Sequence, residues 1–245
     1  MREAEIPTLR EFETWLSLFT DGPIPDEHRW RAWFCVAEYE LEDFEALSET
    51  LADNGASGSF AFLGRDADEQ AEIIDTLDTE GHEIAFHSHR HHTYADLSYD
   101  DAHDAITTGL AAIEDATRIT PTGFFVPFLK VSEGAVTAIE EVGFDWILGR
   151  PERDPDGVEV LDPVTPFDTR RLENDDPEEA MAQLRSEADD GEAPFLFHPP
   201  VVEYHDGLDA FGEWIAAVEP VSVADQLATG GTGVVLDCVR PVRIQ

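Results

Sequence analysis

The sequence predicts an α/β fold in which a parallel sheet is built from strands joined by crossover helices. Short apolar runs alternate with longer amphipathic segments along most of the 245 residues. Such alternation is typical of parallel sheets, whose chemistry lies at the carboxyl ends of the strands. No internal repeat or obvious linker interrupts the pattern, so we expect one domain with insertions.

The first part of the chain supplies most of the predicted elements. Apolar residues at helical spacing predict a helix over 8–19, and a Pro- and Asp-rich loop follows it. Strands are then predicted over 30–37, 58–63, 82–87, 123–128 and 144–148, with helices over 41–54, 66–80, 98–117 and 132–142. Ser98 is expected to cap the third of these helices. Pro127 indicates that its strand lies at an edge or ends there, because proline cannot donate to the ladder.

The second part is less regular. Residues 150–176 are rich in Pro and Asp and are predicted to form a long excursion. Beyond it we expect a helix over 177–189, a strand over 193–198, a helix over 207–218, a short strand and helical turn over 220–229, and a last strand over 233–239. Gly230–Gly233 is interpreted as a flexible turn.

The charge of the chain excludes several classes of partner. The chain has 54 Asp and Glu against 15 Lys and Arg, a net charge of −39. This charge would repel nucleic acids and anionic lipid surfaces, so we expect neither as a partner. The acidic residues are spread along the chain, which favours a protein of a halophilic source whose surface works in concentrated salt. An acidic scaffold or interaction protein is the alternative.

The cysteines and the N-terminus favour a cytoplasmic protein. Two cysteines, Cys35 and Cys238, cannot form a disulfide framework, and Cys35 is expected to lie in the core. The first 16 residues are charged and amphipathic and lack the apolar core of a signal peptide. No apolar run reaches the roughly 18 residues of a membrane span.

The densest chemical signal is a histidine cluster that follows a predicted strand. Four of the nine histidines lie within the six residues 87–92. Neutral imidazole is a common ligand for zinc and related ions, and the spacing of His87 and His91 can direct both at one ion. A solvated loop that happens to be rich in histidine is the alternative.

Other candidates also lie at strand ends. His198 ends a predicted strand and could serve in general acid–base catalysis, or it could bond a loop backbone. Glu38 and Glu40 follow the strand predicted over 30–37, and either carboxylate could complete a metal site with two imidazoles. In so acidic a chain, each glutamate could equally belong to the solvated surface.

Two segments together resemble a known family. The run GSFAFLG at 58–64 is followed by a helix and then by GHEIAFHSHRH at 81–91. This pattern resembles the polysaccharide deacetylases of carbohydrate esterase family 4, which show A-T-F-F-x-x-G and then G-H-E-I-x-x-H-[ST]-x-x-H. The segments FDW at 144–146, FLFHP at 195–199 and VSV at 221–223 are similar to later parts of the family pattern.

The resemblance implies a distorted (β/α)7-type barrel with its core at about 30–227 and a helical extension over 1–29. It implies that His87 and His91 bind a divalent metal, zinc or a related ion. It also implies that His198 is the general acid that protonates the leaving amine. The substrate would be an N-acetylated carbohydrate or a related small amide.

The sequence departs from the family pattern in two places. The family's first motif, T-F-D-D-G, supplies an Asp base and an Asp metal ligand, but the matching positions near Val36 and Ala37 are not acidic. Glu38 is the nearest candidate for the ligand and Glu40 for the base. The family's third motif has an Arg before Pro, and the stretch GFFVP at 123–127 has none. Two functions therefore stay open: a metal-dependent deacetylase, or a catalytically degenerate relative that binds carbohydrate or regulates.

Overall fold

The computed structural model describes residues 41–163, 176–187, 193–199, 202 and 207–238. Within them lies a seven-stranded sheet with the order β5-β4-β3-β2-β1-β7-β6, in which each neighbouring pair is parallel. The strands are β1 (Ser59–Phe62), β2 (Glu83–Phe86), β3 (Gly123–Val131), β4 (Trp146–Pro151), β5 (Glu159–Leu161), β6 (Phe195–Phe197) and β7 (Val234–Asp237). The sheet curls into the predicted distorted (β/α)7-type barrel.

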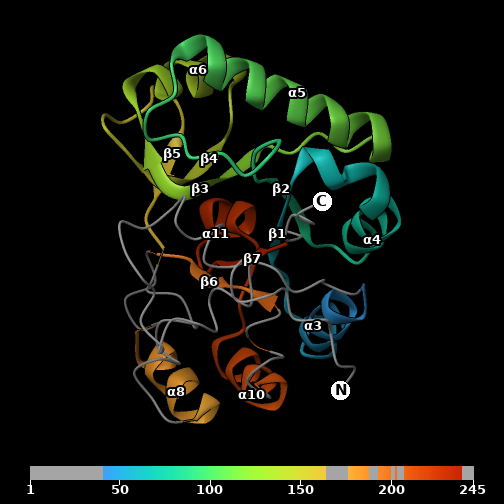
Figure 1. Cartoon of the computed structure of the whole chain (residues 1–245). Coiled ribbons are helices and arrows are strands. Elements are labelled where there is room, and N and C mark those ends of the chain that lie inside the picture. Colours follow the sequence, from blue (N-terminus) through green and yellow to red (C-terminus); the bar gives the residue numbers. More distant parts are fainter. Residues whose placement is uncertain (1–40, 164–175, 188–192, 200–201, 203–206, 239–245) are drawn as a thin grey trace, which may run out of the picture.

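Helices cover the outer side of the curled sheet. They are α3 (Leu41–Asp53), α4 (Ala67–Thr79), α5 (Tyr99–Thr117), α6 (Glu133–Val142), α8 (Pro177–Glu187) and α10 (Leu208–Val218), with a short 3-10 helix η2 (Gly64–Asp66) before α4. In Figure 1, α5 and α6 lie together along one side of the molecule, and α8 and α10 lie along the opposite side. A further helix, α11 (Val223–Thr229), lies within the curve of the sheet.

Most predicted elements within the described residues are confirmed to within a few residues. The residues predicted to begin or end the helices do so in the structure. The Ser98 side chain accepts a hydrogen bond from the Asp101 amide at the start of α5, at 3.2 Å. Gly143 ends α6 with a left-handed φ of 84°, a conformation that glycine adopts without steric cost. The helix predicted over 8–19 and the strand predicted over 30–37 lie outside the described residues.

Alternation along the strands separates an inner core from two outer ones. The inner side carries Ala61, Ala85, Phe125, Leu148, Leu161, Leu196 and Val235, which pack against one another inside the barrel. The residues between them face the helices in two clusters, one under α3, α8 and α10 and one under α5 and α6. Because side chains alternate with a period of two, the inner face of each strand can be followed toward its carboxyl end.

Two predictions about the strands were wrong. The strand that contains Pro127 is not at an edge, because β3 lies between β2 and β4. The register of β3 against β4 shifts between Phe125 and Lys130, so Pro127 lies in an irregular stretch where it need not donate to the ladder. The predicted excursion over 150–176 contains β5, which at three residues was too short to recognise from periodicity.

One end of the barrel is closed by α11. The Val223 amide donates to Ser59 Oγ at 2.8 Å, and the Ala224 amide donates to Glu83 Oε2 at 3.1 Å. The indole Nε1 of Trp146 donates to the other oxygen of Glu83 at 2.8 Å. Ser59, Glu83 and Trp146 are the first residues of their strands, so the amino-terminal end of the barrel is plugged. The carboxyl end is therefore its mouth.

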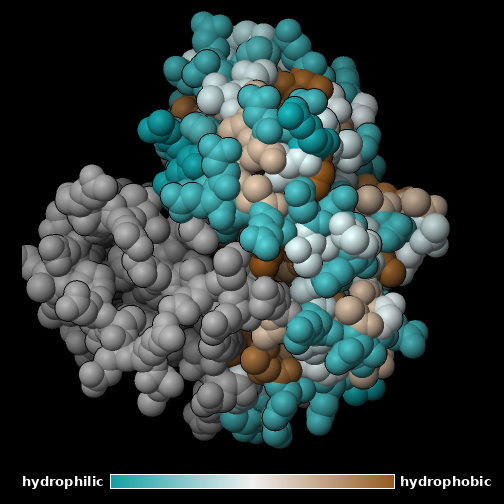
Figure 2. All heavy atoms as spheres, turned by 90° about the vertical axis from the view of Figure 1, so that its right-hand side faces the viewer, coloured by the Kyte–Doolittle hydropathy of each residue, from teal (hydrophilic) through white to brown (hydrophobic). Residues whose placement is uncertain are grey.

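On the face shown in Figure 2, the described residues are predominantly hydrophilic, with hydrophobic side chains in small separate areas. Phe128 and Leu227 are the exposed large hydrophobic residues of the described part of the chain. None of the helices placed in the structure is both long enough and apolar enough to cross a membrane.

A close backbone contact near the mouth leads to a stability prediction. A Cβ atom added at Gly64 would lie 2.5 Å from the backbone of Gly109 in α5. We expect Gly64→Ala to lower the free energy of unfolding by about 1–3 kcal/mol, because neither backbone can move without disturbing its element. Gly212→Ala is the control, since its Cβ would meet only the Thr50 side chain at 3.4 Å and alanine favours the helix. Guanidinium unfolding of both variants would show the difference, and an unchanged midpoint for Gly64→Ala would contradict this packing.

Candidate metal and catalytic site at the mouth of the barrel

Three strands deliver polar side chains to the mouth of the barrel on its inner side. The inner core positions Ala85, Val235 and Leu196 are each followed two residues later by His87, Asp237 and His198. Because the strand period is two, these three side chains continue the inner face beyond its apolar part. The topology places β7 next to both β1 and β6, so Asp237 lies between the two histidines.

Short distances join these residues. Nε2 of His87 lies 3.6 Å from Oδ1 of Asp237, and Nε2 of His198 lies 3.3 Å from Oδ2 of the same carboxylate. The ring centroids of His87 and His91 are 4.9 Å apart. One potential ligand atom from each of His87, His91 and Asp237 lies within 4.8 Å of the other two.

The orientation of His87 is fixed by Phe125. Nδ1 of His87 lies 2.6 Å from the Phe125 carbonyl oxygen, which can only accept, so Nδ1 carries the proton of the neutral ring. The Phe125 ring also stacks on His87, with centroids 4.2 Å apart and an interplanar angle of 23°. This arrangement leaves the lone pair of Nε2 pointing toward the mouth.

The donor set fits a divalent cation. Nε2 of His87 is buried and has no hydrogen-bond partner among the described residues, although Oδ1 of Asp237 faces it. Two acceptors that face each other in a buried place repel unless a positive charge lies between them. Two imidazoles and one carboxylate are a typical ligand set for zinc and related ions, and the structure can therefore accommodate one with small side-chain adjustments.

The loop that carries His91 has a strained backbone. Ser88 and His91 have φ angles of 75° and 56°, in the left-handed region that non-glycine residues rarely adopt. The buried Tyr94 hydroxyl donates to Ser88 Oγ at 3.2 Å, and the Tyr94 carbonyl accepts from the Ser132 amide at 2.9 Å. These bonds hold the loop in the turn that brings His91 back over His87. Strained residues held in this way are typical of functional sites.

The electrostatics favour metal binding. Burial lowers the pKa of His87, and burial together with the neighbouring His87 lowers the pKa of His91 to about 3. Burial opposes the charge of Asp237, but the nearby imidazoles and the hydrogen bond from His198 outweigh it and hold the pKa of Asp237 below its usual range. At neutral pH the site therefore holds neutral imidazoles and an ionised carboxylate, the protonation states that metal ligands need.

These shifts predict how the stability of the metal-free protein depends on pH. The two histidines have a pKa near 6.5 when unfolded and a lower one when folded, so the unfolded state binds more protons between these values. Stability therefore falls as the pH falls, by roughly 2 kcal/mol between pH 7 and pH 5 for a histidine that stays neutral. Guanidinium unfolding in the presence of a chelator would measure this slope. His91→Gln should reduce it, and an unchanged slope in that variant would contradict the assignment.

The structure brings together three of the five residues that the sequence suggested for the site. His87, His91 and His198 meet at the mouth, whereas Glu38 and Glu40 lie outside the described residues. Sequence reasoning missed Asp237. The available signal was an aspartate near the end of the last predicted strand, but a chain with 54 acidic residues makes any single one inconspicuous.

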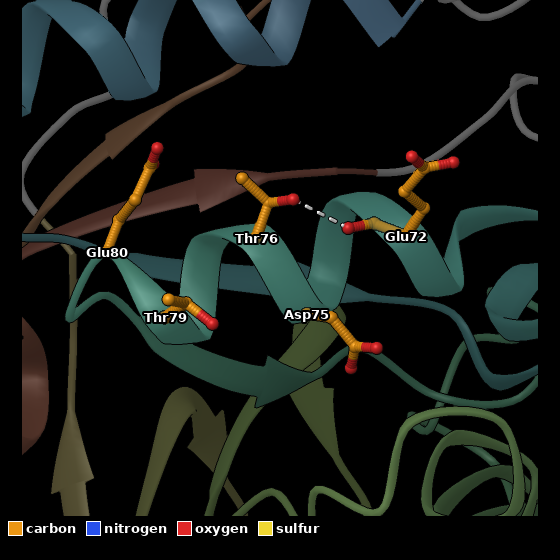
Figure 3. A pocket seen from close by; sticks show the side chains of 5 residues that line it. All are labelled: Glu72, Asp75, Thr76, Thr79 and Glu80. Atoms are coloured by element: carbon orange, nitrogen blue, oxygen red, sulfur yellow. Dashed lines mark hydrogen bonds between the residues drawn. The ribbon is translucent and has the colours of Figure 1, made fainter.

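A shallow depression on α4 is not part of this site. It is lined by five exposed residues of α4 and its end, Glu72, Asp75, Thr76, Thr79 and Glu80. Figure 3 shows that the Glu72 and Asp75 side chains point to different sides of the helix, so they do not converge on a common point.

Comparisons with known proteins agree with this fold. A family model described as polysaccharide deacetylase matches residues 14–147. A Mycobacterium smegmatis protein assigned to the polysaccharide deacetylases superimposes with a TM-score of 0.64 at 24% identity, covering 77% of this chain and 76% of that one. No curated protein matches the sequence.

Two further solved structures have a similar fold. A family 4 acetyl xylan esterase from Clostridium thermocellum, solved with a cobalt ion, has a TM-score of 0.61 at 18% identity, covering 78% of this chain and 87% of that one. A Bacillus anthracis protein described as a family 4 carbohydrate esterase pseudoenzyme has a TM-score of 0.55 at 15% identity, covering 82% and 61%.

Proposed function

Because the chain belongs to the polysaccharide deacetylase family, we propose that it is a metal-dependent deacetylase acting on an N-acetylated carbohydrate or a related small amide. One observation carries the proposal: His87, His91 and Asp237 place ligand atoms within 4.8 Å of one another, and His198 lies on the second oxygen of the same carboxylate. The family membership supports the deacetylase activity, and the donor set supports the metal.

His87 and His91 would hold the ion through ring nitrogens, together with Oδ1 of Asp237. A divalent ion, for which we expect zinc, would polarise the acetyl carbonyl and make a water molecule more acidic. Phe125 keeps His87 in the tautomer whose Nε2 can bind the ion. Glu38 remains the alternative carboxylate ligand.

Proton transfer in this proposal rests on Asp237 and His198. The hydrolysis joins the oxygen of water to the acetyl carbon, breaks the carbon–nitrogen bond and returns a proton to the nitrogen. The Asp237–His198 pair, joined at 3.3 Å, can accept the proton of the attacking water and supply one to the leaving amine. His198 is the proton donor in this scheme. Glu40 remains the alternative base.

The composition supports further proposals about the protein's partners, its cellular location and its solvent. We propose a carbohydrate or other small-molecule substrate and neither nucleic acid nor membrane as a partner, since a net charge of −39 repels both. We also propose that the protein is cytoplasmic and works in a salt-rich solvent. A cytoplasmic location would favour small soluble substrates over cell-wall polymers.

A catalytically degenerate protein is the second candidate. Asp237 is the carboxylate that the described residues bring to the histidines, whereas the family pattern uses one aspartate as base and another as ligand. The Bacillus anthracis pseudoenzyme has a similar fold. Such a protein would bind carbohydrate, or metal, without turnover.

Metal content and acetate release separate the two candidates. The purified protein, loaded with zinc or cobalt, would be incubated with acetylated chito-oligosaccharides and with small acetamides. Release of acetate that stops in His198→Ala, in a variant that still binds metal, supports the deacetylase. Bound metal without any acetate release supports the degenerate protein, and the absence of both refutes the metal site.

A further inference from the structure

Cations are concentrated at the mouth of the barrel although the chain is strongly acidic. Against 54 Asp and Glu the chain has 15 Lys and Arg, of which Lys130 is the only lysine. The segments that end the first four strands each carry one cation: Arg65, Arg90, Lys130 and Arg150. These cations lie at the carboxyl ends of β1 to β4, the same end of the sheet as the site described above, so their charge bears on which substrates can approach.

Two of these cations are neighbours on adjacent strands. Lys130 of β3 is in register with Arg150 of β4. Arg150 follows the inner residue Leu148 by two positions, and Lys130, in register with Arg150, lies on the same face of the sheet. Both side chains therefore lie on the same side of the sheet as His87.

The register also gives the level of this pair along the strands. Phe125, which stacks on His87, is in register with Leu148. Lys130 and Arg150 lie two residues beyond that level on β4, roughly 7 Å along the strand at about 3.3 Å per residue. The pair therefore lies toward the mouth from the level of His87, on the strand next to β2 and on the strand after it.

The ion pairs that the described residues form compensate only one of these two cations. Arg150 forms an exposed ion pair with Asp162 through Nε at 2.8 Å. No hydrogen bond or ion pair engages the Lys130 side chain in the part of the chain that the structure describes. Like charges in register on adjacent strands repel, although acidic residues are abundant in this chain. An anion between them would remove the repulsion.

We propose that Lys130 and Arg150 form a subsite for an anionic substituent, a carboxylate or a phosphate, on the N-acetylated substrate. The inference rests on the proposed function, because it assigns the substrate class of the same site. Arginine and lysine bind both anions through charge-assisted hydrogen bonds, so the shared chemistry does not choose between them.

The test compares matched ligands by calorimetric binding and by acetate release. The probes are N-acetylglucosamine, its 6-phosphate and its 6-carboxylate, which differ only at one carbon. We expect one or both anionic probes to bind about five- to tenfold more tightly than the neutral sugar at the lowest salt concentration at which the protein stays folded, with the preference shrinking as salt is added. The anionic probe whose affinity exceeds that of the neutral sugar by the larger factor identifies the substituent.

Variants make the assignment specific. Lys130→Gln combined with Arg150→Gln should reduce the anion preference to within about twofold while leaving the affinity for the neutral sugar unchanged. Arg185→Gln is the matched control, because it removes the same charge from the exposed face of α8. Equal binding of all probes to the wild type, or a preference that survives the double variant, overturns the inference.

The outcomes also separate this inference from the proposed function. Acetate release from neutral and anionic probes at equal rates, unaffected by the double variant, would leave the deacetylase standing without the subsite. Anion-dependent binding that the double variant abolishes, without any acetate release, would leave the subsite standing on a protein that does not catalyse.

Discussion

Replacing His87 with alanine should abolish metal binding. Its Nε2 is the buried nitrogen that faces Asp237, and its Nδ1 is held by the Phe125 carbonyl. Loss of a partner that only orients a ligand typically costs about 10–100-fold in metal affinity, so removal of the ligand itself should cost at least about 100-fold. Calorimetric titration with zinc, and the absorption of the cobalt-loaded protein, would measure the loss. Acetate release should fall with it.

The control for this prediction lies in the same loop. His92 is exposed and directly follows His91, so His92→Ala removes an imidazole without touching the proposed ligands. His87 is completely buried, and His87→Gln with a near-ultraviolet circular dichroism spectrum shows whether the fold persists. Unchanged zinc affinity in a folded His87 variant would refute the metal centre.

Asp237→Asn should have the second largest effect, because this carboxylate faces the proposed metal ligand His87 through one oxygen and the proposed acid His198 through the other. The change removes the negative charge that faces His87 while keeping the side chain's shape, and it weakens the bond to His198. We expect acetate release to fall by about 10²–10⁴-fold, the usual range for loss of a positioned acid or base. Zinc affinity should fall as well, since the proposed ligand set loses its carboxylate.

Glu38→Gln and Glu40→Gln are the informative comparisons. If Asp237 supplies the carboxylate of the site, both variants should keep zinc affinity and acetate release near the wild-type values. If Glu38 is the ligand and Glu40 the base, as the sequence suggested, these variants should lose activity and Asp237→Asn should not. The zinc titration and the acetate assay together distinguish the two assignments.

The elements of the fold were predictable because their signals are local. Ser98 and Gly143 mark the ends of helices by their capping chemistry, and apolar runs mark the strands. Pro127 misled because the signal for an edge strand is also satisfied by an irregular stretch inside the sheet. The short strand β5 was missed because three residues carry too little periodicity.

The candidate site was only partly predictable. His87, His91 and His198 could be found because two of them lie in a dense histidine cluster and each segment follows an apolar strand. Asp237 could not be found, because its importance comes from the pairing of β7 with β1 and β6, a contact between segments far apart in the sequence. The sequence shows that the arginine of the family's third motif is absent from 123–127, but periodicity cannot show that Phe125 stacks on His87.

The position of β7 has a consequence for how the chain reaches its native state. Val235 pairs with Ser59, so the place between β1 and the edge strand β6 is filled by the last of the described strands to leave the ribosome. Until then β1 and β6 present open edges, and pairings over such long separations form slowly. We expect nascent chains that end before residue 234 to aggregate readily and to depend on chaperones. The capacity to bind metal would then emerge only after residue 237 has been added.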